Sequence, residues 1–131
     1  MHEFSLATDL LNLARREARK AGLIRIDNLF VQIGNIGGVS IDALEFAYSF
    51  LREEDEITKN AELIVERIDG VGKCRSCGGE FQLDFYYLFC PKCSTPTIDI
   101  ISGREFMLVS IEGEESEEEN PIDEKPGVTY G

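Results

Sequence analysis

The chain has 131 residues, the usual size of one domain, and 43% of them are hydrophobic, so most of it is expected to fold around a core. Lys and Arg number 13 against 25 Asp and Glu; the net charge of -12 opposes binding to nucleic acid, and the single His excludes a site built from several imidazoles. No apolar run approaches the roughly 18 residues of a membrane-spanning helix, and the start of the chain lacks the basic and small residues of a secretory signal, so we expect a cytoplasmic protein without a membrane partner.

The first half of the chain alternates between helical and strand patterns. Apolar residues at three- and four-residue steps predict an amphipathic helix over residues 4–21. A two-residue alternation predicts a strand over 24–33. Ser40 is a suitable N-cap, so a second helix is predicted over 40–52. The alternation returns over 61–69, which predicts a second strand.

Two C-x-x-C pairs follow this second strand, Cys74/Cys77 and Cys90/Cys93, with 12 residues between them. Each two-residue spacer lets a chain reversal direct both sulfurs to one point, so the two knuckles supply four thiolates for one tetrahedral ion. A closed site of four Cys indicates structural zinc, because it leaves no open coordination position for catalysis. The residues between the pairs, rich in aromatic side chains from Phe81 on, are predicted to form a short hairpin that covers the site.

Three other uses of the four Cys stay open. Two disulfides require an oxidising compartment, which conflicts with the expected cytoplasmic location. A thiol redox pair requires one C-x-x-C at a helix N-terminus, whereas here two pairs face each other. An iron site like that of rubredoxin uses the same knuckles as zinc, and strong visible iron–thiolate absorption of the purified protein would identify it.

The last predicted strand, over 106–111, follows the cysteine-rich interruption, so the fold class is α+β with an inserted module. We expect a small three-stranded sheet with two helices, plus an inserted zinc-ribbon-like module of four cysteines and a disordered acidic tail. The expected domains are a discontinuous α+β domain over 1–72 and 97–112, a zinc-binding module over 73–96, and the acidic tail over 113–131.

The tail is the most acidic part of the chain. Residues 112–131 carry eight acidic residues and one Lys, a charge of -7, so residues 1–111 carry the remaining -5. Few bulky apolar groups occur there, so the tail cannot bury enough apolar surface to offset the entropy of ordering it. We therefore expect it to be disordered.

The single His lies at position 2, beside the α-amine of Met1. The amine, the deprotonated amide nitrogen of His2 and the ring Nδ1 form fused five- and six-membered chelate rings around one metal ion, and Ni(II) and Cu(II) favour such planar nitrogen sets. Glu3 is a candidate further ligand through its amide or its carboxylate. On composition alone, an exposed terminal His and a Glu that complements the helix dipole are the simpler interpretation.

Several short stretches complete the pattern: Ile33-Gly34, Val39, Leu44-x-Phe46-Ala47, Ala61-x-Leu63 and Gly103-x-Glu105-Phe106. Together with Met1-His2-Glu3 at the start of an amphipathic helix and the paired Cys knuckles, they resemble the HypA/HybF family of nickel metallochaperones. The resemblance covers residues 1–111 and supplies no role for the acidic tail.

The resemblance implies a nickel carrier that is not an enzyme. The ligands it implies are His2, Met1 and Glu3 for nickel, as transiently bound cargo, and Cys74, Cys77, Cys90 and Cys93 for structural zinc. It further implies delivery of nickel to the large subunit of NiFe hydrogenase with a hydrogenase maturation GTPase as partner, while urease as acceptor and a homodimer stay open. The alternative is a zinc-ribbon interaction module that binds protein or nucleic acid and has no nickel role.

Overall fold

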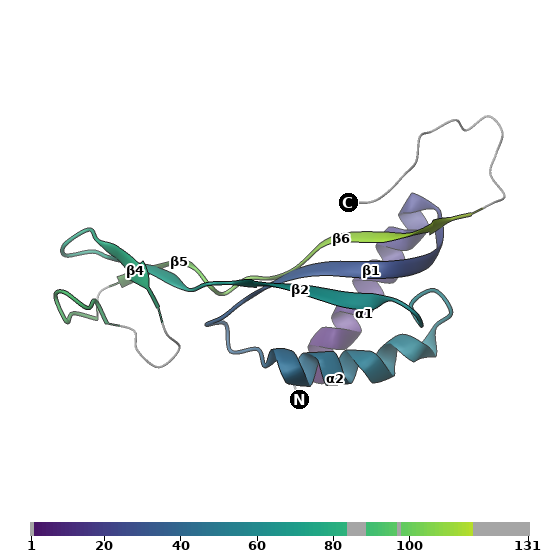
Figure 1. Ribbon diagram of the computed structural model, residues 1–131, viewed down its shortest axis with the longest axis horizontal. Coiled ribbons are helices and arrows are strands. Elements are labelled where there is room, and N and C mark those ends of the chain that lie inside the picture. The colour runs from purple at the N-terminus through teal and green to yellow at the C-terminus, as the bar shows by residue number, and fades with distance from the viewer. Residues whose placement is uncertain (1, 84–88, 97, 117–131) are drawn as a thin grey trace. The chain divides into compact units, whose positions relative to one another are not determined.

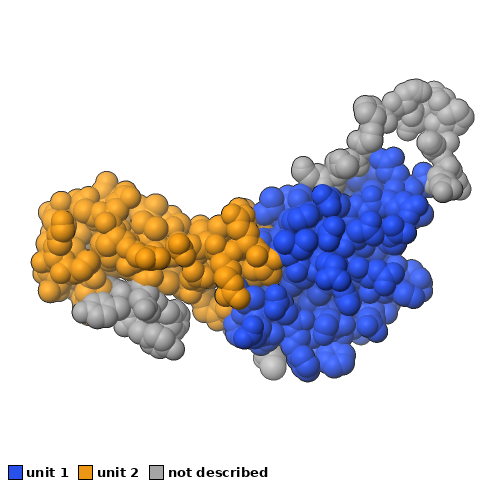
Figure 2. Space-filling view, in the orientation of Figure 1, with its two compact units in different colours: residues 1–31, 40–64, 108–131 blue, residues 32–39, 65–107 orange. Residues whose placement is uncertain are grey.

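The computed structural model describes residues 2–83, 89–96 and 98–116. By its internal contacts the chain forms two compact units, which Figure 2 distinguishes by colour. Unit 1 comprises Met1–Val31, Ser40–Ile64 and Leu108–Gly131, and unit 2 comprises Gln32–Val39 and Val65–Met107.

Two α-helices and six strands occur in the described residues. In chain order the elements are α1 (His2–Ala21), β1 (Leu23–Gly34), α2 (Ile41–Leu51), the 3-10 helix η1 (Arg52–Glu54), β2 (Glu62–Ile68), β3 (Val71–Cys74), β4 (Glu80–Gln82), β5 (Ile98–Ser102) and β6 (Phe106–Glu115). The strands form two three-stranded sheets, ordered β2-β1-β6 and β4-β3-β5, and Figure 1 shows β1 between β2 and β6. The predicted α+β class is therefore confirmed, with one sheet more than expected.

Helix α1 begins two residues earlier than the sequence pattern predicts, so His2 and Glu3 lie in its first turn. Gly22, with a φ of 76°, follows the helix in the left-handed conformation that glycine adopts without strain. The buried face of α1 consists of residues at three- and four-residue steps: Ala7, Leu10, Leu11, Ala14 and Ala18. Because three of these are Ala, α2 can approach α1 closely, and the two helices pack against each other.

Helix α2 contributes the other helical part of the core of unit 1. Ser40 is its N-cap, as predicted, and the Ser40 side chain accepts a hydrogen bond from the N–H of Ala43 at 3.2 Å. Leu44 of α2 and Leu29 of β1 are both completely buried, so both elements contribute to the apolar core of unit 1. No helix among the described residues is long and apolar enough to span a membrane.

Helix α2 connects two neighbouring strands that run in the same direction. The side chain of Gln32 donates to Glu66 at 3.1 Å, and that of Asn35 donates to Asp69 at 3.0 Å. Both pairs keep an offset of 34 residues along the chain. In parallel strands the numbers of paired residues rise together, so their difference stays constant. Strands β1 and β2 are therefore parallel, and α2 is the crossover helix between them.

The sheet of unit 2 was not predicted as a sheet. Strand β3 pairs antiparallel with β4, where Val71 lies opposite Gln82, and with β5, where Cys74 lies opposite Ile98. Strand β3 has only four residues, so no alternation was visible in the sequence. The predicted hairpin from Phe81 onward lies partly outside the described residues; its first part is β4.

Strand β6 continues four residues past its predicted end, into the predicted tail. Gly113 lies directly against the carbonyl oxygen of Arg25, where a Cβ would not fit. Arg25 Nη1 forms an ion pair with Glu114 Oε1 at 2.6 Å, and the N–H of Ser116 donates to the Gly22 carbonyl at 2.9 Å. These contacts with the start of β1 explain why acidic residues continue the strand. The remainder of the predicted disordered tail, 117–131, lies outside the described residues.

Candidate metal centres

The structure brings the four Cys together in unit 2, as their spacing predicts. Their Sγ atoms all lie within 4.8 Å of one another, and all four are free thiols. The Sγ atoms of Cys74 and Cys93 are 4.0 Å apart, and those of Cys77 and Cys90 are 3.9 Å apart. Four sulfurs at about 2.3 Å from a tetrahedral zinc ion lie roughly 3.8 Å from one another. The arrangement therefore has the size of a closed four-thiolate metal site.

In the first knuckle three backbone N–H groups fix the position of the sulfurs. The N–H of Cys77 donates to Cys74 Sγ at 3.4 Å, and the N–H of Gly78 donates to the Cys74 carbonyl at 2.8 Å. The N–H of Cys74 donates to the Gly79 carbonyl at 2.9 Å. This turn requires a positive φ at its fifth residue, and Gly78 has a φ of 77°.

The second knuckle repeats these contacts residue for residue. The N–H of Cys93 donates to Cys90 Sγ at 3.4 Å, and the N–H of Ser94 donates to the Cys90 carbonyl at 2.8 Å. The N–H of Cys90 donates to the Thr95 carbonyl at 3.1 Å. In this knuckle, however, the residue with the positive φ is not a glycine but Ser94, whose φ is 59°. A non-glycine residue there is strained, so the knuckle geometry is retained at a cost in stability.

The electrostatics of the cluster fit a bound dication. The hydrogen bond from the Cys77 N–H lowers the pKa of the Cys74 thiol to about 6. Conversely, the pKa of Cys93 is raised to about 12, chiefly because its thiol hydrogen-bonds to Cys77, and the negative charge of Cys74 opposes its ionisation as well. Four thiolates at these distances repel one another unless a cation lies between them. The donor set and its spacing therefore suit zinc.

The cluster is open on one side. Cys74 and Cys90, the first Cys of each knuckle, are 0% and 2% exposed, whereas Cys77 is exposed. A cavity of about 40 Å³ beside Cys77 is lined in part by Phe81 and Pro91.

Of the predicted nickel ligands, the structure describes His2 and Glu3, and both lie in the first turn of α1. His2 is exposed, and Met1 lies outside the described residues. Glu3 Oε2 accepts a hydrogen bond from the N–H of Ser40 at 3.0 Å, which is the main reason why the pKa of the Glu3 carboxyl is lowered. Sequence reasoning missed this contact, because the two residues are 37 positions apart.

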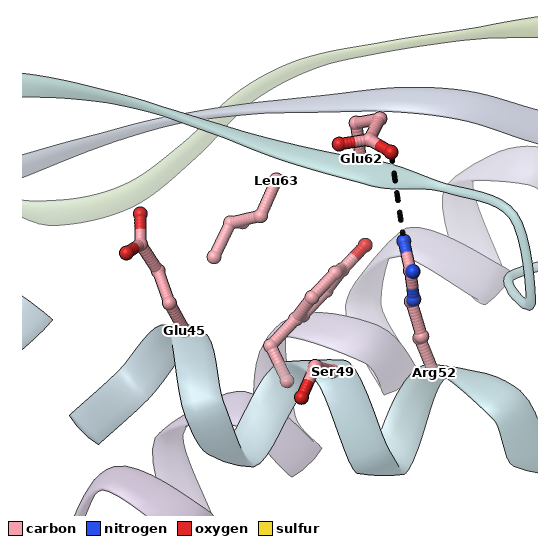
Figure 3. A pocket seen from close by; sticks show the side chains of 6 residues that line it. Glu45, Ser49, Arg52, Glu62 and Leu63 are labelled. Carbon is pink, nitrogen blue, oxygen red and sulfur yellow. Dashed lines mark ion pairs between the residues drawn. The ribbon is translucent and has the colours of Figure 1, made fainter. Parts of the chain in front are cut away.

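A further hollow in unit 1 lies between α2 and β2 (Figure 3). Its volume is about 240 Å³, and it is lined by Glu45, Tyr48, Ser49, Arg52, Glu62 and Leu63. The Tyr48 hydroxyl and Arg52 Nη1 both donate to the carbonyl of Ala61, at 3.1 and 2.8 Å. Burial raises the pKa of Tyr48, which therefore stays a donor. These contacts hold the start of β2 to the end of α2, a structural role that the sequence pattern did not reveal.

A protein-family model described as "Hydrogenase/urease nickel incorporation, metallochaperone, hypA" matches residues 1–113. The hydrogenase maturation factor HypA of Chlorobium luteolum is 38% identical over 111 residues, which cover 85% of this chain and 94% of the relative. The protein of the same name from Chloroflexus aggregans is 39% identical over 113 residues, which cover 86% of this chain and 98% of the relative.

Solved structures agree with these sequence matches. The solution structure of the Ni metallochaperone HypA from Helicobacter pylori is similar with a TM-score of 0.64 and 26% identity, over 87% of this chain and 98% of the other. A second solution structure, of a HypA protein, has a TM-score of 0.62 and 28% identity, over 86% of this chain and 96% of the other. The likeness in fold therefore extends over nearly the whole length of both solved chains.

Proposed function

Because this chain belongs to the HypA family of hydrogenase/urease nickel-incorporation metallochaperones, we propose that it carries Ni(II) on its first three residues and delivers it for the maturation of NiFe hydrogenase. The observation that carries the site assignment is the location of the only His. His2 is exposed in the first turn of α1, next in sequence to Met1.

The proposed ligands are nitrogen atoms: the α-amine of Met1, the amide nitrogen and ring Nδ1 of His2, and the amide nitrogen of Glu3. The first N–H groups of an α-helix have no partner inside the helix, so deprotonating these amides breaks no helical hydrogen bond. The helix dipole also stabilises the resulting negative charge. An ordinary α-amine has a pKa of about 7.7–8.0, so nickel capture releases protons near neutral pH and is reversible there.

The Glu3 amide is the better donor in this proposal than the Glu3 carboxylate. Oε2 of the carboxylate already accepts the hydrogen bond from the Ser40 N–H, which holds the carboxylate against the start of α2. A planar set of four nitrogens is complete without it.

We assign zinc to Cys74, Cys77, Cys90 and Cys93 in a structural role. When bound, zinc supplies a cross-link between the two knuckles and has no open coordination position. The chain's own residues hold the sulfurs: the N–H groups of Cys77 and Cys93 each donate to the sulfur three residues earlier. We keep residues 73–96 as the zinc-binding module and residues 1–72 and 97–112 as the nickel-binding domain.

The proposed partners follow from hydrogenase maturation, which the names of the relatives state. They are a maturation GTPase, the large subunit of NiFe hydrogenase as acceptor, and a second copy of this chain, and the delivery takes place in the cytoplasm. The family description also names urease, which we retain as a second acceptor.

The experiment is a titration with Ni(II) of three zinc-loaded proteins: the unmodified chain, His2→Ala, and Ser5→Ala. Ser5 is exposed in the same helix and is the matched control. We expect His2→Ala to lose more than about 100-fold in affinity, since even indirect partners of a metal ligand are worth about 10- to 100-fold. Ser5→Ala should bind as the unmodified chain does. Unchanged affinity and spectrum in His2→Ala, with zinc retained, would contradict the proposal.

A further inference from the structure

Family membership leaves the acidic tail without a role. The family model ends at residue 113, and the tail continues for 18 residues beyond it. Its acidic segment, residues 117–124, carries five carboxylates and no base: Glu117, Glu118, Glu119, Asp123 and Glu124. A segment of this charge needs a basic surface or water around it.

The last two turns of α1 provide an exposed basic surface. Arg16, Arg19 and Lys20 are exposed, and because Arg19 and Lys20 lie three and four residues after Arg16, both neighbour Arg16 on one side of the helix. We call these three residues the α1 basic face. In the part of the chain that the structure describes, the side chains of Arg16 and Arg19 have no hydrogen-bond or ion-pair partner, and Lys20 Nζ lies 3.7 Å from Glu17. Most of the positive charge of this face is therefore available.

The described part of the chain ends beside the C-terminal end of α1, directly before the acidic segment begins. The N–H of Ser116 donates to the Gly22 carbonyl at 2.9 Å, and the N–H of Gly22 donates to the Arg19 carbonyl at 3.3 Å. The last described residue therefore contacts the residue that ends α1. Just before it, Glu114 forms an ion pair with Arg25 at 2.6 Å. An acidic residue just before the acidic segment is therefore already paired with a basic side chain.

The distances match. From Gly22 back to Arg16 the helix axis rises about 9 Å, at 1.5 Å per residue. An extended chain spans about 3.3–3.6 Å per residue, so residues 117–119 cover roughly 10 Å. The segment is therefore long enough to place three consecutive Glu side chains beside the three bases. Each exposed ion pair is weak by itself, but a short tether gives the segment an effective concentration in the millimolar range.

We propose that the acidic segment docks on the α1 basic face of its own chain and thereby closes this face to other anionic partners. The docking is electrostatic, so it depends on ionic strength. It holds at about 0.01 M salt, where charges interact over about 30 Å, and is lost at about 1 M, where the range is about 3 Å. The docking does not involve the nickel ligands, so its test is independent of the test of the proposed function.

The test compares amide and Arg side-chain NMR spectra of the zinc-loaded full chain and of a chain that ends at Ser116. At about 0.01 M salt we expect shifts in Arg16, Arg19 and Lys20, and no difference at about 1 M. In the full chain, E117Q/E118Q/E119Q should reproduce the spectrum of the shortened chain. The matched control, E53Q/E54Q/E56Q, removes three exposed charges elsewhere in unit 1 and should not reproduce the spectrum of the shortened chain.

Charge reversal gives the sharper form of the test. R16E/R19E/K20E should abolish the contact, and combining it with E117K/E118K/E119K should restore it, with the salt dependence unchanged. Identical α1 spectra with and without the tail at low salt would overturn the proposal, as would shifts that persist at about 1 M salt. Shifts that grow with protein concentration would also overturn it, because the segment would then bind a second copy.

Discussion

Glu3 holds the start of the neighbouring helix: its Oε2 accepts a hydrogen bond from the backbone N–H of Ser40 at 3.0 Å, and Ser40 is the N-cap of α2. The Ser40 hydroxyl in turn accepts from the Ala43 N–H at 3.2 Å. A residue of the proposed nickel site therefore has a structural task as well. Nickel bound through the Glu3 amide leaves this pair of hydrogen bonds intact.

The Ser40 contact should depend on pH. It lowers the pKa of the Glu3 carboxyl below its usual 4.5, so its contribution to stability is complete above pH 4.5 and is lost as the pH falls through the lowered pKa. We expect the Ser40 amide NMR shift to follow this titration. Glu3→Gln keeps an acceptor oxygen but cannot titrate, so the Ser40 shift should then be flat in the same range. A pH-dependent Ser40 shift that survives in Glu3→Gln would argue against the assignment.

Substitutions at the equivalent positions 78 and 94 of the two knuckles should have opposite effects on stability. Ser94→Gly removes a strained positive φ, and we expect the zinc-loaded protein to gain about 0.5–1 kcal/mol in free energy of unfolding. Gly78→Ala introduces the same strain into the first knuckle and should cost about 1–2 kcal/mol. Denaturant unfolding of both variants measures this. The equivalence of the knuckles is refuted if both changes shift stability in the same direction.

Removal of zinc should affect unit 2 selectively. Without a cation the four thiols no longer hold the knuckles, so hydrogen-exchange protection of the Cys74 and Gly78 amides should be lost. The buried amides of α1, around Leu11, should stay protected because their packing does not involve the cysteines. Cys90→Ser should likewise lose zinc, whereas Ser76→Ala, within the first knuckle but without a sulfur, should retain it. Parallel loss of protection in α1 would count against a local zinc effect.

Tyr48 and Arg52 share one acceptor, the carbonyl of Ala61. Tyr48→Phe removes one donor and leaves the other, so we expect a loss of about 0.5–1.5 kcal/mol in free energy of unfolding. Combining it with Arg52→Met removes both side-chain donors and should cost more than the two single changes together. Strict additivity would show that the two side chains do not act on the same carbonyl group.

The elements of unit 1 were predictable because each carries a long apolar period. Leu10, Ala14 and Ala18 mark the buried face of α1 at helical steps, and Leu29 and Val31 mark that of β1 at strand steps. The cysteine cluster was predictable for another reason. The C-x-x-C spacing is a local geometric constraint, and the structure brings all four sulfurs within 4.8 Å.

What was missed depends on contacts between residues distant in the chain. Strand β3 exists because β4 and β5 pair with its two edges, and its four residues show no period of their own. The extension of β6 depends on Arg25, 89 positions before Glu114. The Glu3 contact with Ser40 likewise joins the starts of two helices. Neither composition nor spacing carries this information.

The most direct test of the central claim is X-ray absorption at the nickel edge on protein whose cysteine cluster is loaded with zinc. We predict a planar nickel site of nitrogen ligands that includes one imidazole and no sulfur. One extra residue before Met1, which moves the free α-amine away from His2, should weaken nickel binding and leave zinc bound. Sulfur ligands to nickel, or an unchanged nickel spectrum in the extended protein, would contradict the account.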